Sequence, residues 1–371
     1  MSENTLLYEK IINYLKQEIN SGALKPGSKL PTEIALAERF GVSRITSKRA
    51  FEDLRAEGLI YRVRGSGSFV TEKKNIVRSK VISGDSSLDH SKVISLVFPT
   101  DTYSGGYMNV VAGASKALDG TDYLLCIHCS NMSLDEEKEL LMQLYNKGVG
   151  GIIYYPISDN KNIEIVNKFY LENYPIVSID KYFESVPLSY IVSDNLKGAY
   201  EATKHLIKLG HKKISFLSDN KIEDATSVRN RYFGFCKAMK EFGIPIDERM
   251  VKNGDFVGLD EEKTKEILRE LMDMGMTAAC TINDYIASFI IKSLNEIGYN
   301  VPKDVSITGF DNLDFANLLT VPLTTVRQDL VQIGQSAMEY ILDVIESGNQ
   351  QRLQKVLPIE LIIRNSTKEF I

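Results

Sequence analysis

The sequence has little cysteine and no long apolar run. Four cysteines in 371 residues are too few for a disulfide framework, which fits a reducing compartment. No stretch of about 18 apolar residues occurs, so we expect no helix that crosses a membrane. The first residues, MSENTLLYEK, lack a basic stretch followed by an apolar one, so we expect no secretory signal. Together these features predict a cytoplasmic protein, and the length of 371 residues predicts two or three domains, each large enough to bury a core.

The formal net charge of −5 argues against a nucleic-acid partner only if the charges are evenly spread. Residues 1–80 hold 15 Lys and Arg against 9 Asp and Glu, whereas the remainder holds 29 against 40. A basic module of charge +6 therefore precedes an acidic one of charge −11, which favours nucleic-acid binding by the first. Between them lies a Ser- and Lys-rich stretch without periodicity. We expect a head in residues 1–71, a linker in residues 72–91 and a core in residues 92–371.

The head has the pattern of a winged helix. Apolar residues at helical spacing predict a first helix over residues 6–20. Thr32 and Ser43 are suited to cap two further helices, which are expected to end at Gly41 and Gly58. The segments LIYRVR and SFVTE flank a GSG turn and predict a hairpin. Two helices joined by a short turn and followed by a hairpin form a winged helix-turn-helix.

Basic and hydroxyl side chains gather at the start of the third predicted helix, from Arg44 to Arg49. Recognition helices enter the major groove by their N-terminus, where the helix dipole also favours phosphate. Arg62 and Arg64 precede the glycines of the hairpin, where a wing approaches the DNA backbone. The alternative is a winged helix used for protein contacts. The clustering of Lys and Arg at groove-facing positions favours DNA.

The segment LPTEIALAERFGVSRITSKRAFEDLRAEGLIYRVRGSGSFV resembles the DNA-binding domain of the GntR regulators. That resemblance implies operator contacts from Glu33, Arg44, Thr46 and Arg49, and from the wing near Gly67. The expected DNA-binding residues are Thr32, Glu33, Arg44, Thr46, Ser47, Lys48, Arg49, Arg64, Gly65 and Gly67.

The core alternates short apolar segments with amphipathic ones, at a period of about 25 to 30 residues. This pattern predicts an α/β fold of doubly wound parallel sheets. The alternation restarts after Asp194, so we expect two lobes. Lobe 1 is expected to comprise residues 92–190 and 313–325, and lobe 2 residues 191–312 and 326–371.

Polar residues follow the predicted strands, where parallel sheets bind ligands. They are Thr100, Asp101, Tyr107, Asp180, Asp194, Asn283, Asp284 and Asp311. Arg231 is expected to open a helix of lobe 2. Carboxylates, an amide and a guanidinium beside aromatic rings suit a hydroxyl-rich sugar. For any single Asp, the alternative is that it caps the following helix.

Several core segments, among them KHLIKLGHKKISFLS, RNRYFGF, NDYIASFIIKSLNEIG and PLTTVRQD, are together similar to the LacI/GalR regulators. That core is related to periplasmic sugar-binding proteins. The resemblance implies that Asp180, Arg231, Asn283 and Asp311 bind the effector. The expected effector-binding residues are Asp101, Tyr107, Asp180, Arg231, Asn283 and Asp311.

A GntR-type head on a LacI-type core is the architecture of the arabinose-responsive repressors, which this chain resembles. The resemblance implies a homodimer on palindromic operator DNA, released by L-arabinose or a related pentose, with no catalytic residue, cofactor, metal or membrane partner. Alternative interpretations are a GntR-headed regulator that responds to a different small ligand, such as a hexose or a nucleoside, and a winged helix fused to an enzyme domain. A pyridoxal-dependent fusion would need a lysine site and a longer core. A binding protein for export is opposed by the winged helix.

Two further clusters are interpreted as structural. Cys126 and Cys129 form a CxxC within an apolar strand, without the second pair that a zinc site needs. Asp135, Glu136 and Glu137 are interpreted as a charge cluster at a helix start.

Overall fold

The computed structural model describes residues 7–20, 23–25, 27–56, 60–63, 67–70, 89–100, 106–256, 258, 260–348 and 351–370. By its internal contacts the chain divides into two compact units, residues 1–87 and 88–371. The first unit contains the predicted head and the second the predicted core.

The head folds as three helices and a hairpin, as predicted. Its elements are α1 (Leu7–Asn20), α2 (Glu33–Phe40), α3 (Arg44–Ala56), β1 (Ile60–Val63) and the antiparallel β2 (Gly67–Val70). Thr32 Oγ1 accepts from the amide of Ala35 at 3.1 Å and so caps α2. Ser43 Oγ caps α3 by accepting from the amide of Thr46 at 3.2 Å. Gly41 ends α2 in the left-handed conformation, at a φ of 62°.

Lobe 1 of the core is a parallel sheet in the order β13-β7-β6-β5-β3-β4. Its strands are β3 (Val93–Phe98), β4 (Leu124–Cys129), β5 (Gly151–Tyr154), β6 (Ile176–Ile179), β7 (Ser189–Ser193) and β13 (Gln354–Leu357). Its helices are α4 (Tyr107–Ala117), α5 (Leu134–Asn146), α6 (Ile163–Leu171) and α11 (Leu330–Ser347).

Lobe 2 has a second sheet, in the order β14-β12-β11-β10-β8-β9, which is parallel except for β14. Its strands are β8 (Ile214–Ser218), β9 (Val251–Asn253), β10 (Ala278–Thr281), β11 (Ser306–Asp311), β12 (Thr324–Gln328) and β14 (Ile359–Ile362). Its helices are α7 (Asn195–Lys208), α8 (Thr226–Glu241), α9 (Glu261–Asp273) and α10 (Asp284–Glu296). The predicted α/β class with doubly wound sheets is confirmed.

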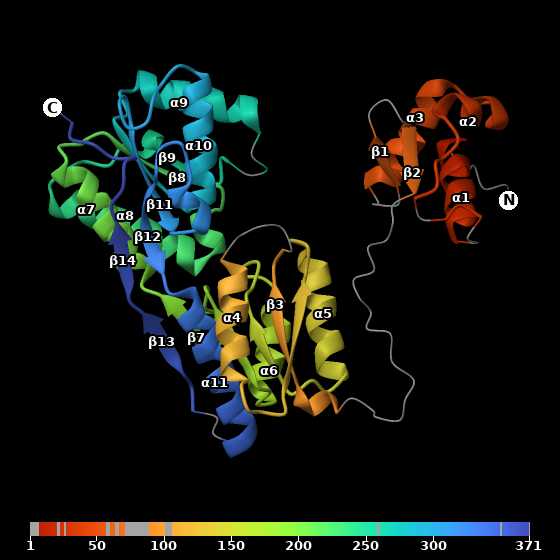
Figure 1. Ribbon diagram of the computed structural model, residues 1–371, viewed down its shortest axis with the longest axis horizontal. Coiled ribbons are helices and arrows are strands. Elements are labelled where there is room, and N and C mark those ends of the chain that lie inside the picture. The colour runs from red at the N-terminus through yellow and green to blue at the C-terminus, as the bar shows by residue number, and fades with distance from the viewer. Residues whose placement is uncertain are drawn as a thin grey trace. The chain divides into compact units, whose positions relative to one another are not determined.

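The chain crosses between the lobes three times: from β7 to α7, from β12 to α11, and from β13 to β14 (Figure 1). The predicted lobe bounds are therefore wrong for two segments beyond residue 312. Residues 313–325 belong to lobe 2, where Leu323 joins the apolar core. By contrast, α11 belongs to lobe 1, because Ile333, Ala337 and Ile341 pack into the core that contains Ile94.

Among the described residues, each lobe holds a helix pair in backbone contact. In lobe 1 a Cβ on Gly113 of α4 would lie 1.9 Å from the carbonyl oxygen of Val331 in α11, and one on Gly334 would lie 1.9 Å from that of Val110. In lobe 2 a Cβ on Gly234 of α8 would lie 2.2 Å from the carbonyl oxygen of Leu196 in α7. This close contact fixes α8, which carries Arg231 one turn earlier, against its own lobe.

Candidate functional site

The first candidate site is the start of α3 in the head. Arg44, Lys48 and Arg49 are exposed there, and no acidic residue occupies the first turn. Arg44 and Lys48 lie one turn apart and so share a face of the helix. The positive end of the helix dipole adds to their charge, which makes this turn suited to phosphate.

The other predicted DNA contacts differ in position. Thr46 is half-buried and its hydroxyl lies 2.8 Å from that of Ser43. Ser47 is fully buried on the core side of α3, so the prediction that it touches DNA does not fit this geometry. Helical spacing explains the difference, because Ser47 lies on the same side as Ala50 and Leu54, which are also buried.

The remaining head residues are only partly described. Thr32 is exposed, although its hydroxyl oxygen is engaged as the cap of α2. Glu33 begins α2 and Gly67 begins β2. Arg64 and Gly65 lie outside the described residues.

The second candidate site is a cavity of about 200 Å³ in the core, lined from both lobes. Lobe 1 contributes an aromatic wall, in which Tyr107 stacks on Phe98 at 4.4 Å between centroids and meets the edge of Tyr155 at 5.3 Å. Lobe 2 contributes mostly polar side chains. An apolar ring opposite polar groups is the arrangement that a sugar ring with hydroxyl edges requires.

Arg231 lies at the centre of the polar side. Its Nε donates to Asn195 Oδ1 at 2.8 Å, Nη1 donates to the carbonyl oxygen of Ile282 at 2.5 Å, and Nη2 lies 3.5 Å from Asp311 Oδ1. Its guanidinium also covers the ring of Phe310 at 3.7 Å. The prediction that Arg231 opens its helix is wrong, because α8 begins five residues earlier, at Thr226.

Asp311 faces Arg231 at the end of β11, in backbone with a φ of 107°. Burial raises the pKa of its carboxyl to about 6, although the guanidinium of Arg231 opposes the rise. Gln328 Nε2 donates to Asp311 Oδ1 at 2.7 Å. A carboxylate held between a guanidinium and an amide is oriented to accept hydrogen bonds from the hydroxyl groups of a ligand.

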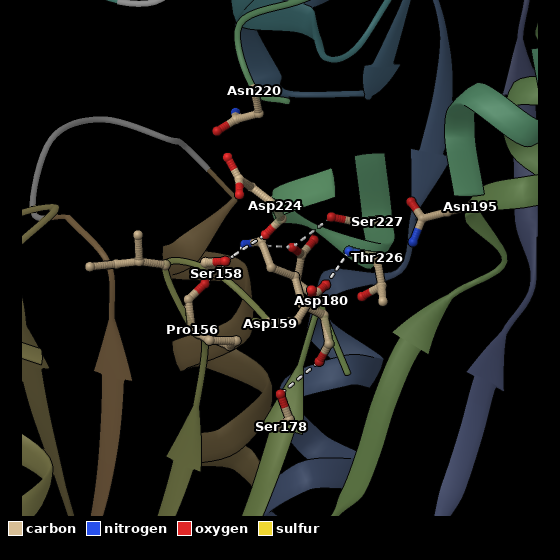
Figure 2. Close-up of polar contacts among 12 residues, drawn as sticks. Pro156, Ser158, Asp159, Ser178, Asp180, Asn195, Asn220, Asp224, Thr226 and Ser227 are labelled. Atoms are coloured by element: carbon tan, nitrogen blue, oxygen red, sulfur yellow. Dashed lines mark hydrogen bonds and ion pairs between the residues drawn. The ribbon is translucent and has the colours of Figure 1, made fainter. Parts of the chain in front are cut away.

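Asp180 and Asn283 complete the described part of the predicted effector set. Asp180 lines the cavity from the end of β6 and forms an ion pair with Lys181 Nζ at 3.2 Å. Its carboxylate also accepts a hydrogen bond from Ser227 Oγ at 3.3 Å (Figure 2). Asn283 lines the cavity but also caps α10 by accepting from the amide of Ile286 at 2.8 Å. Both the ligand and the capping interpretation therefore apply to Asn283. Asp101 lies outside the described residues.

Two other residues at strand ends serve the fold. Asp194 caps α7 by accepting from the amide of Lys197 at 3.0 Å. Asp284 is fully buried, and burial raises the pKa of its carboxyl to about 8, with the charge of Asp311 adding to the rise. Its carboxyl accepts from the amide of Leu313 at 2.7 Å and from the hydroxyl of Thr325.

Lys181, Asn220 and Gln328 also line the cavity and were missed in the sequence. Lys181 and Asn220 lie two residues beyond β6 and β8, and Gln328 is the last residue of β12. A search for polar residues up to two positions beyond each predicted strand would have found Lys181 and Asn220. Gln328 was missed because β12, with the sequence TTVRQ, lacks a long apolar run.

Within the described ranges, no group of three or more His, Cys, Asp or Glu could hold a metal ion. None of the described helices is long and apolar enough to cross a membrane.

Comparison with known families matches both units. Residues 7–70 match the gntR family of bacterial regulatory proteins, and residues 203–367 match a periplasmic binding protein-like domain. The arabinose metabolism transcriptional repressor of Geobacillus stearothermophilus is 31% identical, over 96% of this chain and 97% of its own. The same repressor from Halalkalibacterium halodurans is 27% identical, over 96% of each chain.

A solved structure shares the core fold. The crystal structure of the transcription regulator CcpA of Lactococcus lactis superimposes with a TM-score of 0.67 and 25% identity, over 74% of this chain and 99% of that one. The two-lobed architecture of the core is therefore that of the LacI-like regulators.

Proposed function

The chain belongs to the family of the arabinose metabolism transcriptional repressors, and from this premise we propose that it represses sugar-utilisation genes until a pentose releases it from its operator. The cavity between the two lobes carries this proposal. Its volume of about 200 Å³ has room for several water molecules, which suits one monosaccharide. We infer that the sugar is L-arabinose or a close relative.

The charges around the cavity favour an uncharged ligand. Asp180 is paired with Lys181, and Asp311 with Arg231. Each carboxylate already has a cationic partner. The negative charge of a phosphorylated sugar would therefore find no unpaired cation among these four residues. A neutral sugar exchanges hydrogen bonds with the same groups without that cost. We assign effector binding to Tyr107, Asp180, Arg231, Asn283 and Asp311, and keep Asp101 as a candidate.

The head supplies the operator contact in this proposal, through Arg44, Thr46, Lys48 and Arg49 of α3, with Thr32, Glu33 and the wing. We propose that residues 1–71 form the DNA-binding domain, residues 72–91 a linker, and residues 92–371 the effector-binding and dimerisation domain. The division of the chain near residue 87 supports these bounds. From the proposed DNA target we infer that the protein acts in the cytoplasm.

We propose that the protein binds a palindromic operator as a homodimer, since paired recognition helices read half-sites about one helical turn apart. Strand β4 supports this, because it is the outermost strand of its sheet and carries the exposed apolar residues Leu124 (53% exposed) and Ile127 (49%). An Ile127→Glu variant should sediment as a monomer. A variant that remains dimeric would place the interface elsewhere.

The test of function uses DNA that the full chain selects from a random duplex pool. In a gel shift, L-arabinose should release the selected DNA, whereas D-glucose and adenosine should leave it bound. Because effector and operator affinities are reciprocally linked, the DNA should weaken L-arabinose binding by the same factor. Release by a hexose or nucleoside would correct the effector class. If no ligand of the panel releases the DNA, the proposed function is wrong.

A further inference from the structure

The N-terminus of α8 obtains its side-chain cap from the opposite lobe. The N-cap residue of α8, Ala225, offers no side-chain acceptor to the first amides of the helix. Instead the carboxylate of Asp159, in the connection between β5 and α6 of lobe 1, accepts from the amide of Thr226 (Figure 2). A negative charge at this end of a helix is also favoured by the helix dipole.

The residues on either side of Asp159 bind the same segment of lobe 2. Ser158 Oγ donates to the carbonyl oxygen of Asp224 at 2.8 Å, and Asn160 Nδ2 donates to that of Glu223 at 2.8 Å. Three consecutive residues, 158–160, thus pair with the segment that leads into α8. We call residues 158–160 the latch loop.

The latch loop is held in place by its own lobe. Glu137 lies in the first turn of α5, as predicted, and is fully buried. Its Oε1 accepts from the amide of Ile157 at 2.8 Å, and its Oε2 accepts from Asn162 Nδ2 at 2.8 Å. One carboxylate therefore fixes both ends of the loop. A loop fixed in this way loses little conformational entropy when it meets its partner.

The latch loop borders the effector cavity. Ile157 and Ala225, the neighbours of the paired segments, both line it, and so do Asp180 and Ser227. Every latch contact joins residues of different lobes, so all of them break when the lobes separate. Burial raises the pKa of Asp159, while its hydrogen bonds with Thr226 lower it.

We propose that the latch loop holds the two lobes closed over the cavity even without effector, and thereby sets the sugar concentration at which the protein leaves its operator. Asp159 acts in this as a positioning residue, since it stabilises the closed cavity without lining it. The dependence on sugar concentration rests on the proposed function, whereas closure by the latch does not.

Hydrogen exchange of the full chain without effector tests closure. The variant is Asp159→Ala, and the matched control is Asp273→Ala, at an exposed residue of α9. Loss of a helix cap should speed amide exchange in segment 223–230 about fivefold in the first variant and leave it unchanged in the control. Equal exchange in the wild type and Asp159→Ala would show that the latch does not close in solution.

Calorimetry with L-arabinose tests the second half of the proposal. Asp159→Ala should weaken L-arabinose binding about fivefold, because closing then lacks the cap. Asp159→Asn should recover part of the loss, since its amide oxygen still accepts from the Thr226 amide. If Asp159→Ala binds L-arabinose as tightly as the wild type, the latch loop does not set the sugar concentration at which the protein responds. If the wild type itself does not bind L-arabinose, the proposed effector fails, and the exchange experiment still decides whether the latch exists.

Discussion

Replacing Arg231 by Lys should remove most of the effector affinity and leave operator binding intact. Arg231 joins three structural parts: Asn195 at the start of α7, Ile282 after β10, and Asp311 at the end of β11. A lysine keeps the positive charge, but its single ammonium cannot reach three partners that a guanidinium fork reaches together. Asp311 would then lose the orientation in which it faces the cavity.

The size of the effect follows from the bonds lost. A hydrogen bond to a charged group contributes about 1.5–3 kcal/mol. A lysine replaces one of the three contacts of Arg231. Part of the interaction energy lost with the other two is lost equally from the free and the effector-bound protein, and that part does not change Kd. If one contact differs between the two states, Kd for L-arabinose should rise about ten- to hundredfold.

The assay is calorimetry with L-arabinose on the wild type and on Arg231→Lys. The matched control is Arg269→Lys, at an exposed position of α9. Thermal melts show whether each variant is folded, and gel shifts show whether the head still binds DNA. Binding of L-arabinose by Arg231→Lys within twofold of the wild type would refute this account of the site.

Three other predictions concern the head and the stability of the core. Arg44→Ala or Arg49→Ala should weaken operator binding and lower the slope of log affinity against log salt by about 0.9 each; an unchanged slope would place these side chains away from phosphate. Between pH 5 and 8 the folded state holds a proton on Asp284 that the unfolded state has released, because burial raises its pKa to about 8. The free energy of unfolding should therefore fall by about 1.4 kcal/mol per pH unit in urea melts, relative to Asp284→Asn, and parallel curves would contradict this. Gly334→Ala should destabilise the core by ~1–3 kcal/mol, since its Cβ would meet the Val110 carbonyl oxygen at 1.9 Å, and an unchanged urea midpoint would be inconsistent with that contact.

The head could be predicted almost completely because its signals are local. Thr32, Ser43 and Gly41 act within four residues of their own positions, as caps or as a left-handed helix end. The alternation of strands and helices in the core is equally local, so the α/β class was also predictable. Ser47 was misplaced because hydroxyl residues at the start of a recognition helix were all assigned to DNA, without regard to the side of the helix on which each lies.

The errors in the core concern contacts between distant segments. The start of α8 was placed too late because its N-cap residue is Ala225 and the side chain that caps it, Asp159, lies 67 residues away. Likewise, Glu137 was correctly predicted at the start of a helix, but its burial depends on the distant loop that it fixes. Periodicity also does not say which sheet a helix covers, which is why α11 was assigned to the wrong lobe.

The distribution of apolar and polar contacts bounds how this core can move. Each large apolar cluster of the described residues belongs to a single lobe, and backbone contact at Gly113, Gly334 and Gly234 ties the helix pairs within the lobes. Between the lobes, the latch loop contributes hydrogen bonds, each of which exchanges for water at a net cost of about 1 kcal/mol. Motion is therefore expected between rigid lobes, and these hydrogen bonds together resist it by a few kcal/mol. A coupling of 1–3 kcal/mol changes operator affinity about 5- to 150-fold, so a much larger release by the sugar would require a change within the lobes as well.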